Sequence, residues 1–211
     1  TVSETTELIA RGLVVSVATF LHWQRFKVPI TVAVGAGAVL VVAIGFLIRS
    51  FPSLEDNLNI VLFIGGFGML SLAMTWDLSD RERLTYRSDA AFWLHLLAAP
   101  LLIHSVFGDM IGRDSADSLM GAMLMIVIYL LISLISVCID RRALMVSGLV
   151  YALYALQTIF RNYGIVDASF AITTLMIGSG LLVLSALWHK VRKALVSRLP
   201  EKLQSYLPTL N

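Results

Sequence analysis

The feature that most constrains this chain is a set of seven long apolar runs separated by short polar segments. The runs cover residues 8–23, 29–48, 58–76, 90–107, 118–138, 143–160 and 170–188. A helix needs about 20 residues to cross the hydrocarbon core of a bilayer. Membrane strands alternate apolar and polar residues, whereas these runs are continuously apolar, as in Val39–Ile48. The pattern therefore predicts an all-α, polytopic transmembrane helix bundle of about seven spans.

The proportion of charged residues agrees with a membrane location. Only 14% of the 211 residues are charged and 58% are hydrophobic, whereas a soluble domain carries about 25% charged residues. A surface that faces lipid stays apolar without cost, so the deficit of charge needs no other explanation. The net charge of +2 is too small to indicate nucleic-acid binding, and the single Cys138 matches no disulfide or metal spacing.

Lysine and arginine alternate between the loops in a way that predicts orientation. Twelve of the sixteen follow the first, third, fifth and seventh runs: Arg25, Lys27, Arg81, Arg83, Arg87, Arg141, Arg142, Lys190, Arg192, Lys193, Arg198 and Lys202. The other loops hold only Arg49, Arg113 and Arg161, and Arg11 lies inside the first run. Because basic loops face the cytoplasm, we expect residue 1 outside and residue 211 inside. All four tryptophans fall at the predicted cytoplasmic ends, where indole prefers the headgroup layer.

Two further predictions concern helix continuity and the end of the chain. Pro100 lies inside the fourth run and is expected to kink or break that helix. Residues 1–189 are predicted to form the bundle, and residues 190–211 an amphipathic interfacial helix on anionic lipid, interrupted by Pro200 and Pro208. The apolar positions of this tail recur every four residues, at Val191, Leu195, Leu199, Leu203 and Leu207. A helix that binds a protein partner is the alternative interpretation of the tail.

The most polar stretch, residues 76–89, contains the first candidate binding residues. It mixes the carboxylates Asp77, Asp80, Glu82 and Asp89 with the guanidinium groups Arg81, Arg83 and Arg87. The simplest interpretation is a solvated cytoplasmic loop in which an aspartate or Ser88 caps a helix. The functional alternative is a docking surface, or a mouth in which the three arginines bind an anionic headgroup or a small polar ligand.

His95 is the polar residue that the sequence singles out for testing. It lies about 9 Å below the membrane interface at 1.5 Å per residue, and an ionisable group within a span is functional by default. Candidate ligand- or partner-binding residues are therefore His95, Arg81, Arg83, Arg87, Asp89 and Trp93. His95→Ala is expected to fold but to alter function. No acidic residue or lysine lies near the middle of a run, which argues against ion-coupled transport.

Haem binding is the cofactor hypothesis that the histidines raise. A haem held by two histidines needs both at matched depth on facing helices. His22 and His189 match the depth of His95 poorly, so no cofactor or metal is expected. Phosphate-loop, zinc and nucleophile motifs are also absent from the sequence.

Residues 76–80 and 87–100 form a distinctive stretch that resembles a group of uncharacterised multi-pass inner-membrane proteins of proteobacteria. Residues 22–30, 140–144 and 198–200 are also similar to that group. The resemblance implies a bacterial inner-membrane location and no particular activity. It also implies further membrane segments upstream, which agrees with a chain that begins at Thr1 without an initiator methionine.

Three classes of function are compatible with this pattern. The first is a non-enzymatic scaffold or accessory subunit of a membrane complex, with a protein partner or a second copy beside the lipid bilayer. The second is a transporter or channel for a small or lipid-like substrate, which Pro100 and His95 favour. The third is a haem- or quinone-binding redox module. No enzymatic activity is expected.

Overall fold

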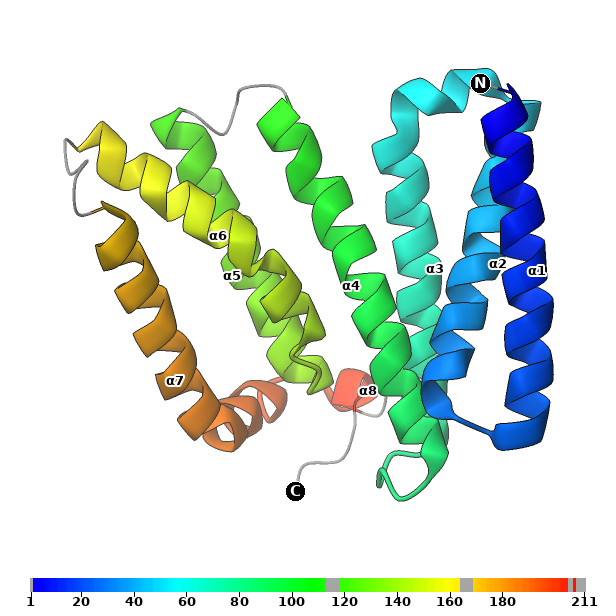
Figure 1. Cartoon of the computed structure of the whole chain (residues 1–211). Helices are drawn as coiled ribbons and strands as arrows, with labels where there is room; N and C mark the ends of the chain where they lie inside the picture. The colour runs from blue at the N-terminus through cyan, green and yellow to red at the C-terminus, as the bar shows by residue number, and fades with distance from the viewer. Residues whose placement is uncertain (1, 113–117, 164–168, 205–206, 208–211) are drawn as a thin grey trace. The chain divides into compact units, whose positions relative to one another are not determined.

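The computed structural model describes residues 2–112, 118–163, 169–204 and 207, and within them every regular element is a helix. Seven helices are long: α1 (Val2–Phe26), α2 (Pro29–Ser50), α3 (Leu58–Ser79), α4 (Tyr86–Gly112), α5 (Leu119–Ile139), α6 (Ala143–Asn162) and α7 (Ser169–Val196) (Figure 1). A short 3₁₀ helix, η1 (Pro52–Asn57), and a four-residue α8 (Glu201–Gln204) complete the described elements. The predicted all-α class is confirmed.

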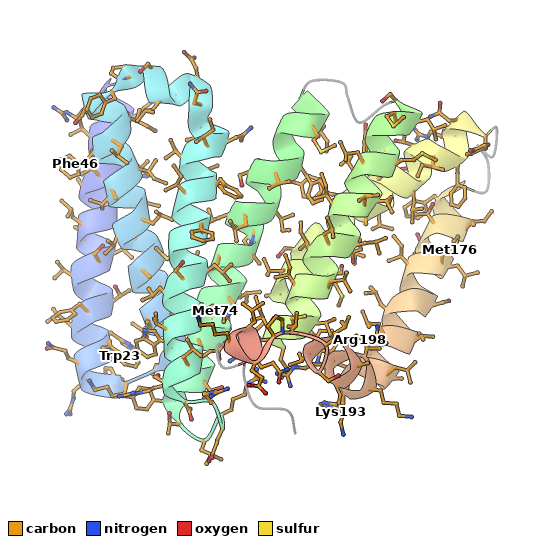
Figure 2. The ribbon with its side chains drawn as sticks, turned by 180° about the vertical axis from the view of Figure 1, so that it is seen from behind. Trp23, Phe46, Met74, Met176, Lys193 and Arg198 are labelled. Atoms are coloured by element: carbon orange, nitrogen blue, oxygen red, sulfur yellow. The ribbon has the colours of Figure 1, made fainter. Side chains whose placement is uncertain are left out.

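Six of the long helices, α2 to α7, are long and apolar enough to cross a membrane. Their outer faces are apolar as well, as exposed side chains such as Phe46 on α2 and Met176 on α7 show (Figure 2). A lipid environment accounts for such faces. The remaining helix, α1, has sufficient length but contains Glu4, Glu7 and Arg11 in its first half. The described residues therefore support six spans, and a seventh stays a prediction.

The chain divides into two compact units, Thr1–Ser105 and Val106–Asn211, and the boundary falls inside α4. In the first unit α1 and α2 form an antiparallel pair, and α3 lies beside α2 (Figure 1). Lys27 joins α1 to α2 with a φ of 54°, and Pro29 begins α2 at a position where its missing N–H is no loss. η1 contacts both α2 and α3 at the opposite end.

Close helix packing in the first unit depends on glycine. A Cβ atom at Gly12 of α1 would lie 2.6 Å from Val42 Cγ2, and one at Gly45 of α2 would lie 2.7 Å from Ile9 Cγ1. Both separations are too short for real carbon atoms, so the two helices approach where a side chain is missing. Helices in lipid gain van der Waals contact from such small residues.

Gly66 of α3 gives a test of the same packing against α4. A Cβ atom there would lie 3.0 Å from Leu101 Cβ and from Leu102 Cγ and N, whereas a Cβ atom at Gly68 would meet nothing within 4 Å. We expect Gly66→Val to lower the free energy of unfolding by about 1–3 kcal/mol, because overpacking displaces the α4 backbone. Gly68→Val is the matched control and should be near neutral in denaturant titrations in detergent. Equal losses for both variants would contradict this account of the α3–α4 contact.

The second unit contains α5, α6 and α7, with α5 and α6 packed along each other and α7 beside both. Asp140 ends α5 in the left-handed region, with a φ of 60°, and its N–H donates to the carbonyls of Ser136 and Val137. The side chains of Val137, Met145 and Trp188 form a buried cluster that joins the three helices. Phe107 stacks on Tyr151 with ring centroids 4.9 Å apart.

The structure bears on two sequence-based predictions. Of the kink or break predicted at Pro100, the break is wrong, because α4 continues from Tyr86 to Gly112, and the kink stays a prediction. Membrane helices tolerate an internal proline when neighbouring groups satisfy the carbonyl that it frees. The predicted interfacial helix is not confirmed: α7 continues to Val196, across the expected boundary at residue 189, and in the described part of the tail the four-residue α8 follows Pro200. Residues 205–206 and 208–211 of that tail lie outside the described residues.

Candidate functional site

Asp77 lies inside α3 rather than in the following loop. The sequence pattern ends the third apolar run at residue 76, but α3 continues to Ser79 and buries Asp77 to 2% exposure. Asp77 follows the fully buried Ala73 by four residues, so both lie on the helix face that turns inward. The spacing of four residues from Ala73 places Asp77 on this face once α3 is known to continue, whereas the apolar run alone ends before Asp77.

His95 faces this carboxylate from α4. Its side chain is 1% exposed, and its Nδ1 lies 2.8 Å from the carbonyl oxygen of Ala91. Because a carbonyl only accepts hydrogen bonds, Nδ1 carries the proton and donates it to Ala91. The other ring nitrogen, Nε2, then lies 3.7 Å from Asp77 Oδ2.

Both side chains of the Asp77–His95 pair are buried, with side-chain exposures of 1% for Asp77 and 0% for His95. A buried carboxylate is costly unless a cation or a hydrogen bond compensates it, so His95 stabilises Asp77 where it lies. Beside the pair, Ala33, Ala73 and Leu94 form an apolar cluster that Trp76 and Trp93 extend. The pair therefore joins α3 to α4 inside an apolar interior.

The other candidate residues occupy different surroundings. Trp93 is half-buried against the Ala33–Ala73–Leu94 cluster and makes an edge contact with Phe92. Arg81 and Arg83 are half-buried in the turn between α3 and α4, and Asp89 is exposed in the first turn of α4. Arg87 is exposed and lines a pocket together with Lys27 of the α1–α2 turn. The structure thus places His95 beside Asp77, and it places Arg87 and Lys27 in the lining of one pocket. Asp77 and Lys27 were not among the candidates that the sequence suggested.

Asp80 organises the turn that carries these arginines. Its carboxylate accepts hydrogen bonds from the hydroxyl of Thr85 at 2.7 Å and from the backbone N–H groups of Thr85 and Leu84 at 2.8 and 3.1 Å. Arg83 adopts a φ of 57° within the turn that these bonds close. The Thr85 hydroxyl is the main cause that holds the pKa of Asp80 below its ordinary value, and the backbone donors add to it, although partial burial acts in the opposite direction. Asp80 therefore stabilises the turn in its ionised form.

Acid should weaken this turn through Asp80. Because the folded-state pKa is lowered, its contribution is fully present above the ordinary aspartate pKa of about 3.9 and is lost as the pH falls through the folded value. We expect Asp80→Asn to lower the melting temperature at pH 7. Between neutral and acid pH, the melting temperature of this variant should fall less than that of the wild type. Melting curves in detergent between neutral and acid pH measure both. Asp89→Asn, an exposed aspartate on α4, is the control, and an identical pH profile for Asp80→Asn and wild type would contradict the assignment.

A second polar cluster lies in the second unit, where the α5–α6 turn meets α7. Asp140 Oδ1 accepts a hydrogen bond from Trp188 Nε1 at 2.7 Å and lies 3.8 Å from Arg192 Nε. Both partners are buried, Arg192 to 4% exposure. Arg142 lies over the Trp188 ring, 4.7 Å from its centroid, and donates to Ser185 Oγ at 3.1 Å. The sequence suggested no role for this turn, because Asp140 and its partner Trp188 are 48 residues apart in the sequence.

The histidines and acidic residues bear on the expectation that no metal or haem is bound. They contain no group of three histidine, cysteine or acidic side chains placed to hold a metal ion. His22 Nδ1 lies 3.1 Å from Thr31 Oγ1, between α1 and α2. The haem hypothesis stays untested.

Comparison with family models, curated proteins and solved structures finds no match to this chain. The resemblance to proteobacterial inner-membrane proteins therefore remains an expectation from the sequence. Function has to be inferred from the geometry of the two units.

Proposed function

We propose that this chain is a non-enzymatic multi-pass membrane protein that acts as a scaffold or accessory subunit of a membrane complex. The proposal rests on the contacts that the ionisable groups inside the two units make. Asp77 faces His95 within the first unit, and Asp140 faces Trp188 and Arg192 within the second. Both sets of contacts join helices within one unit, so these ionisable groups stabilise the fold.

The cavities of the first unit support this reading. Three of them have volumes of about 220, 350 and 470 Å³, and they lie on α1, α2, α3, η1 and the start of α4. Neither Asp77 nor His95 lines any of these three cavities. A transporter or an enzyme needs its ionisable groups where the substrate arrives.

The surface of α7 supports a protein partner. Leu175 and Leu182 are among its most exposed side chains, and Cβ atoms added at Gly178 and Gly180 would meet nothing within 4 Å. Small residues on a lipid-facing helix allow a second helix to approach closely. A neighbouring subunit in the membrane fits this face.

The proposed orientation places the turns at Lys27, Arg83 and Asp140 on the cytoplasmic side of a bacterial inner membrane. It follows from the distribution of lysine and arginine over the loops. In a Cys138→Ser background, Glu82→Cys should react with a membrane-impermeant maleimide only from the cytoplasmic side, and Glu55→Cys of η1 only from outside. Labelling of both cysteines from one side would contradict this topology.

The complex itself is tested by extraction into polymer discs that retain native lipid, followed by native mass spectrometry. We expect a species heavier than the 23.2 kDa chain, with a fixed stoichiometry of a second membrane polypeptide or a second copy. Gly180→Leu should reduce that species, whereas Gly68→Leu on α3 is the matched control. Recovery of the chain alone with lipid would contradict the scaffold role.

A transporter for a small or lipid-like substrate is the second candidate, and the buried Asp77–His95 pair is the observation that favours it. Ionisable side chains within membrane helices often mark a transport pathway. In sealed vesicles, this candidate predicts that the wild type moves a fluorescent phospholipid between leaflets, and that folded Asp77→Asn does not. The scaffold role predicts the same rate of lipid movement for the wild type, for this variant and for empty vesicles.

A further inference from the structure

Two hollows of the first unit adjoin at the end where α1 meets α2 and α3 meets α4. The polar hollow, about 350 Å³, has Lys27 and Arg87 in its lining together with Tyr86, and its lining contains no carboxylate. The apolar hollow, about 220 Å³, is a groove along α1 and α2 toward Phe20 and Val39. Both hollows include Trp23 and Trp76 in their walls.

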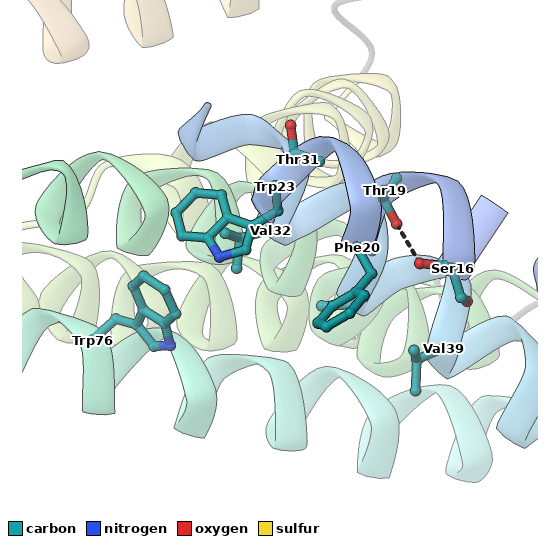
Figure 3. Close-up of a pocket in the computed structure, with 10 residues that line it drawn as sticks. Ser16, Thr19, Phe20, Trp23, Thr31, Val32, Val39 and Trp76 are labelled. Atoms are coloured by element: carbon teal, nitrogen blue, oxygen red, sulfur yellow. Dashed lines mark hydrogen bonds between the residues drawn. The ribbon is translucent and has the colours of Figure 1, made fainter. Parts of the chain in front are cut away.

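The aromatic side chains form the floor between the two hollows. Figure 3 shows the rings of Trp23 and Trp76 at one end of the groove, with Phe20 and Val39 farther along it. The two indoles meet edge to face with centroids 6.3 Å apart, and Tyr86 meets Trp23 at 5.7 Å. Indole and phenol rings at a helix end match the headgroup layer of a bilayer.

The positive charges of the polar hollow have no acidic partner in the part of the chain that the structure describes. Lys27 Nζ lies 5.2 Å above the centre of the Trp23 ring, and Arg87 is exposed. The hydroxyls of Thr75 and Ser79, which also face this hollow, already donate to the carbonyls of Leu72 and Trp76. An anion in the hollow is therefore recognised through the two cations.

We infer that the first unit binds one anionic phospholipid at this place. The phosphate lies between Lys27 and Arg87, and an acyl chain follows the groove past Trp23 and Trp76 toward Phe20 and Val39. The inference goes beyond the scaffold role, and it holds for either orientation because it depends only on charge and shape. A soluble anion would fill the polar hollow and leave the groove empty, whereas a lipid satisfies both.

The expected preference follows from the charge. A lysine or arginine near an anionic membrane surface contributes about a fivefold preference. Salt screens such contacts, with a Debye length of about 10 Å at 0.1 M, so the preference should weaken as ionic strength rises. The apolar groove adds affinity for the acyl chain of the lipid, but it does not distinguish one headgroup from another.

The test measures tryptophan quenching by phospholipids with brominated acyl chains, diluted into phosphatidylcholine vesicles that contain the full chain. We expect brominated phosphatidylglycerol to quench more strongly than brominated phosphatidylcholine at the same fraction. Lys27→Gln and Arg87→Gln should each lower that preference about fivefold. The matched control, Arg25→Gln, removes one exposed charge from the same end of α1 that does not line the polar hollow, and it should leave the preference unchanged. An equal decrease in the control would mean general attraction to the surface and would overturn the site.

The groove is tested separately from the charges. Val39→Phe narrows it and should reduce quenching by both brominated lipids, whereas Val34→Phe, on an exposed part of α2 outside the lining, should not. Circular dichroism confirms that each variant is folded, and Ala36→Leu replaces Val39→Phe if that variant is not. Glycerol phosphate, which has no acyl chain, should not compete with the brominated lipid for the wild-type protein, so it should leave the quenching unchanged. Full competition by glycerol phosphate, or no effect of filling the groove, would overturn the proposal of a bound lipid.

Discussion

His95→Leu is expected to lower the free energy of unfolding by about 3–5 kcal/mol, the range seen when one partner of a buried charged pair is removed. The substitution leaves the carboxylate of Asp77, 2% exposed, beside an apolar side chain. Chemical denaturation in detergent or in lipid discs measures the loss. This expectation replaces the one drawn from the sequence, in which His95→Ala folds normally, because the structure shows the imidazole buried beside Asp77.

A double-mutant cycle separates the pair from its surroundings. Asp77→Leu alone should cost less than His95→Leu, because the remaining imidazole keeps its hydrogen bond from Nδ1 to the carbonyl oxygen of Ala91. The double variant should recover most of the loss, since two apolar side chains of similar volume replace both partners. Additive losses in the double variant would mean that the two side chains stabilise the protein independently, and would remove the structural role assigned to their contact.

The second large effect is expected at Asp140, where Asp140→Ala should also cost about 3–5 kcal/mol. Three changes coincide there. Trp188 Nε1 loses its acceptor, the buried guanidinium of Arg192 loses a carboxylate 3.8 Å away, and alanine takes a backbone position with a φ of 60°. An L-residue other than glycine, asparagine or aspartate pays about 1–2 kcal/mol for that conformation.

A series of substitutions at Asp140 separates these three contributions. Asp140→Asn tolerates the left-handed backbone and keeps a side-chain oxygen for Trp188, so it loses only the charge. Asp140→Gly keeps the backbone and loses the whole side chain. We expect unfolding free energies to fall in the order wild type, Asn, Gly, Ala, in the same denaturation assay. A glycine variant as stable as the wild type would show that the bonds to α7 contribute nothing.

Both substitutions probe contacts that local sequence cannot reveal. Asp77 and Asp140 look alike in the sequence, since each lies at the end of an apolar run and near arginines. In the structure Asp77 faces a histidine 18 positions later in the sequence, whereas Asp140 accepts a bond from a tryptophan on α7. Asp80, which also lies between an apolar run and arginines, bonds instead to the backbone of its own turn.

The helices and their approximate limits were predictable from the sequence, because transfer of a side chain into lipid is a local property that sums along a run. Each of the seven apolar runs corresponds to a long helix, and most helix ends extend a few residues farther. The extension has a physical reason: a helix does not stop at the edge of the hydrocarbon, since its backbone bonds continue into the headgroup layer. For α3 that extension moved Asp77 from a loop into the interior.

What only the tertiary structure decided is which distant residues meet. The sequence placed His95 inside a span and Arg87 in a basic loop; the structure buries His95 within α4, and Arg87 lies in the first turn of the same helix. The sequence did not pair His95 with Asp77, or Arg87 with Lys27 some sixty positions earlier. Hydropathy specifies how deep a residue lies, but helix rotation and neighbours are set by packing, through small residues such as Gly12 and Gly66. For that reason the helical segments were predictable from the sequence, whereas the pairing of distant side chains required the tertiary structure.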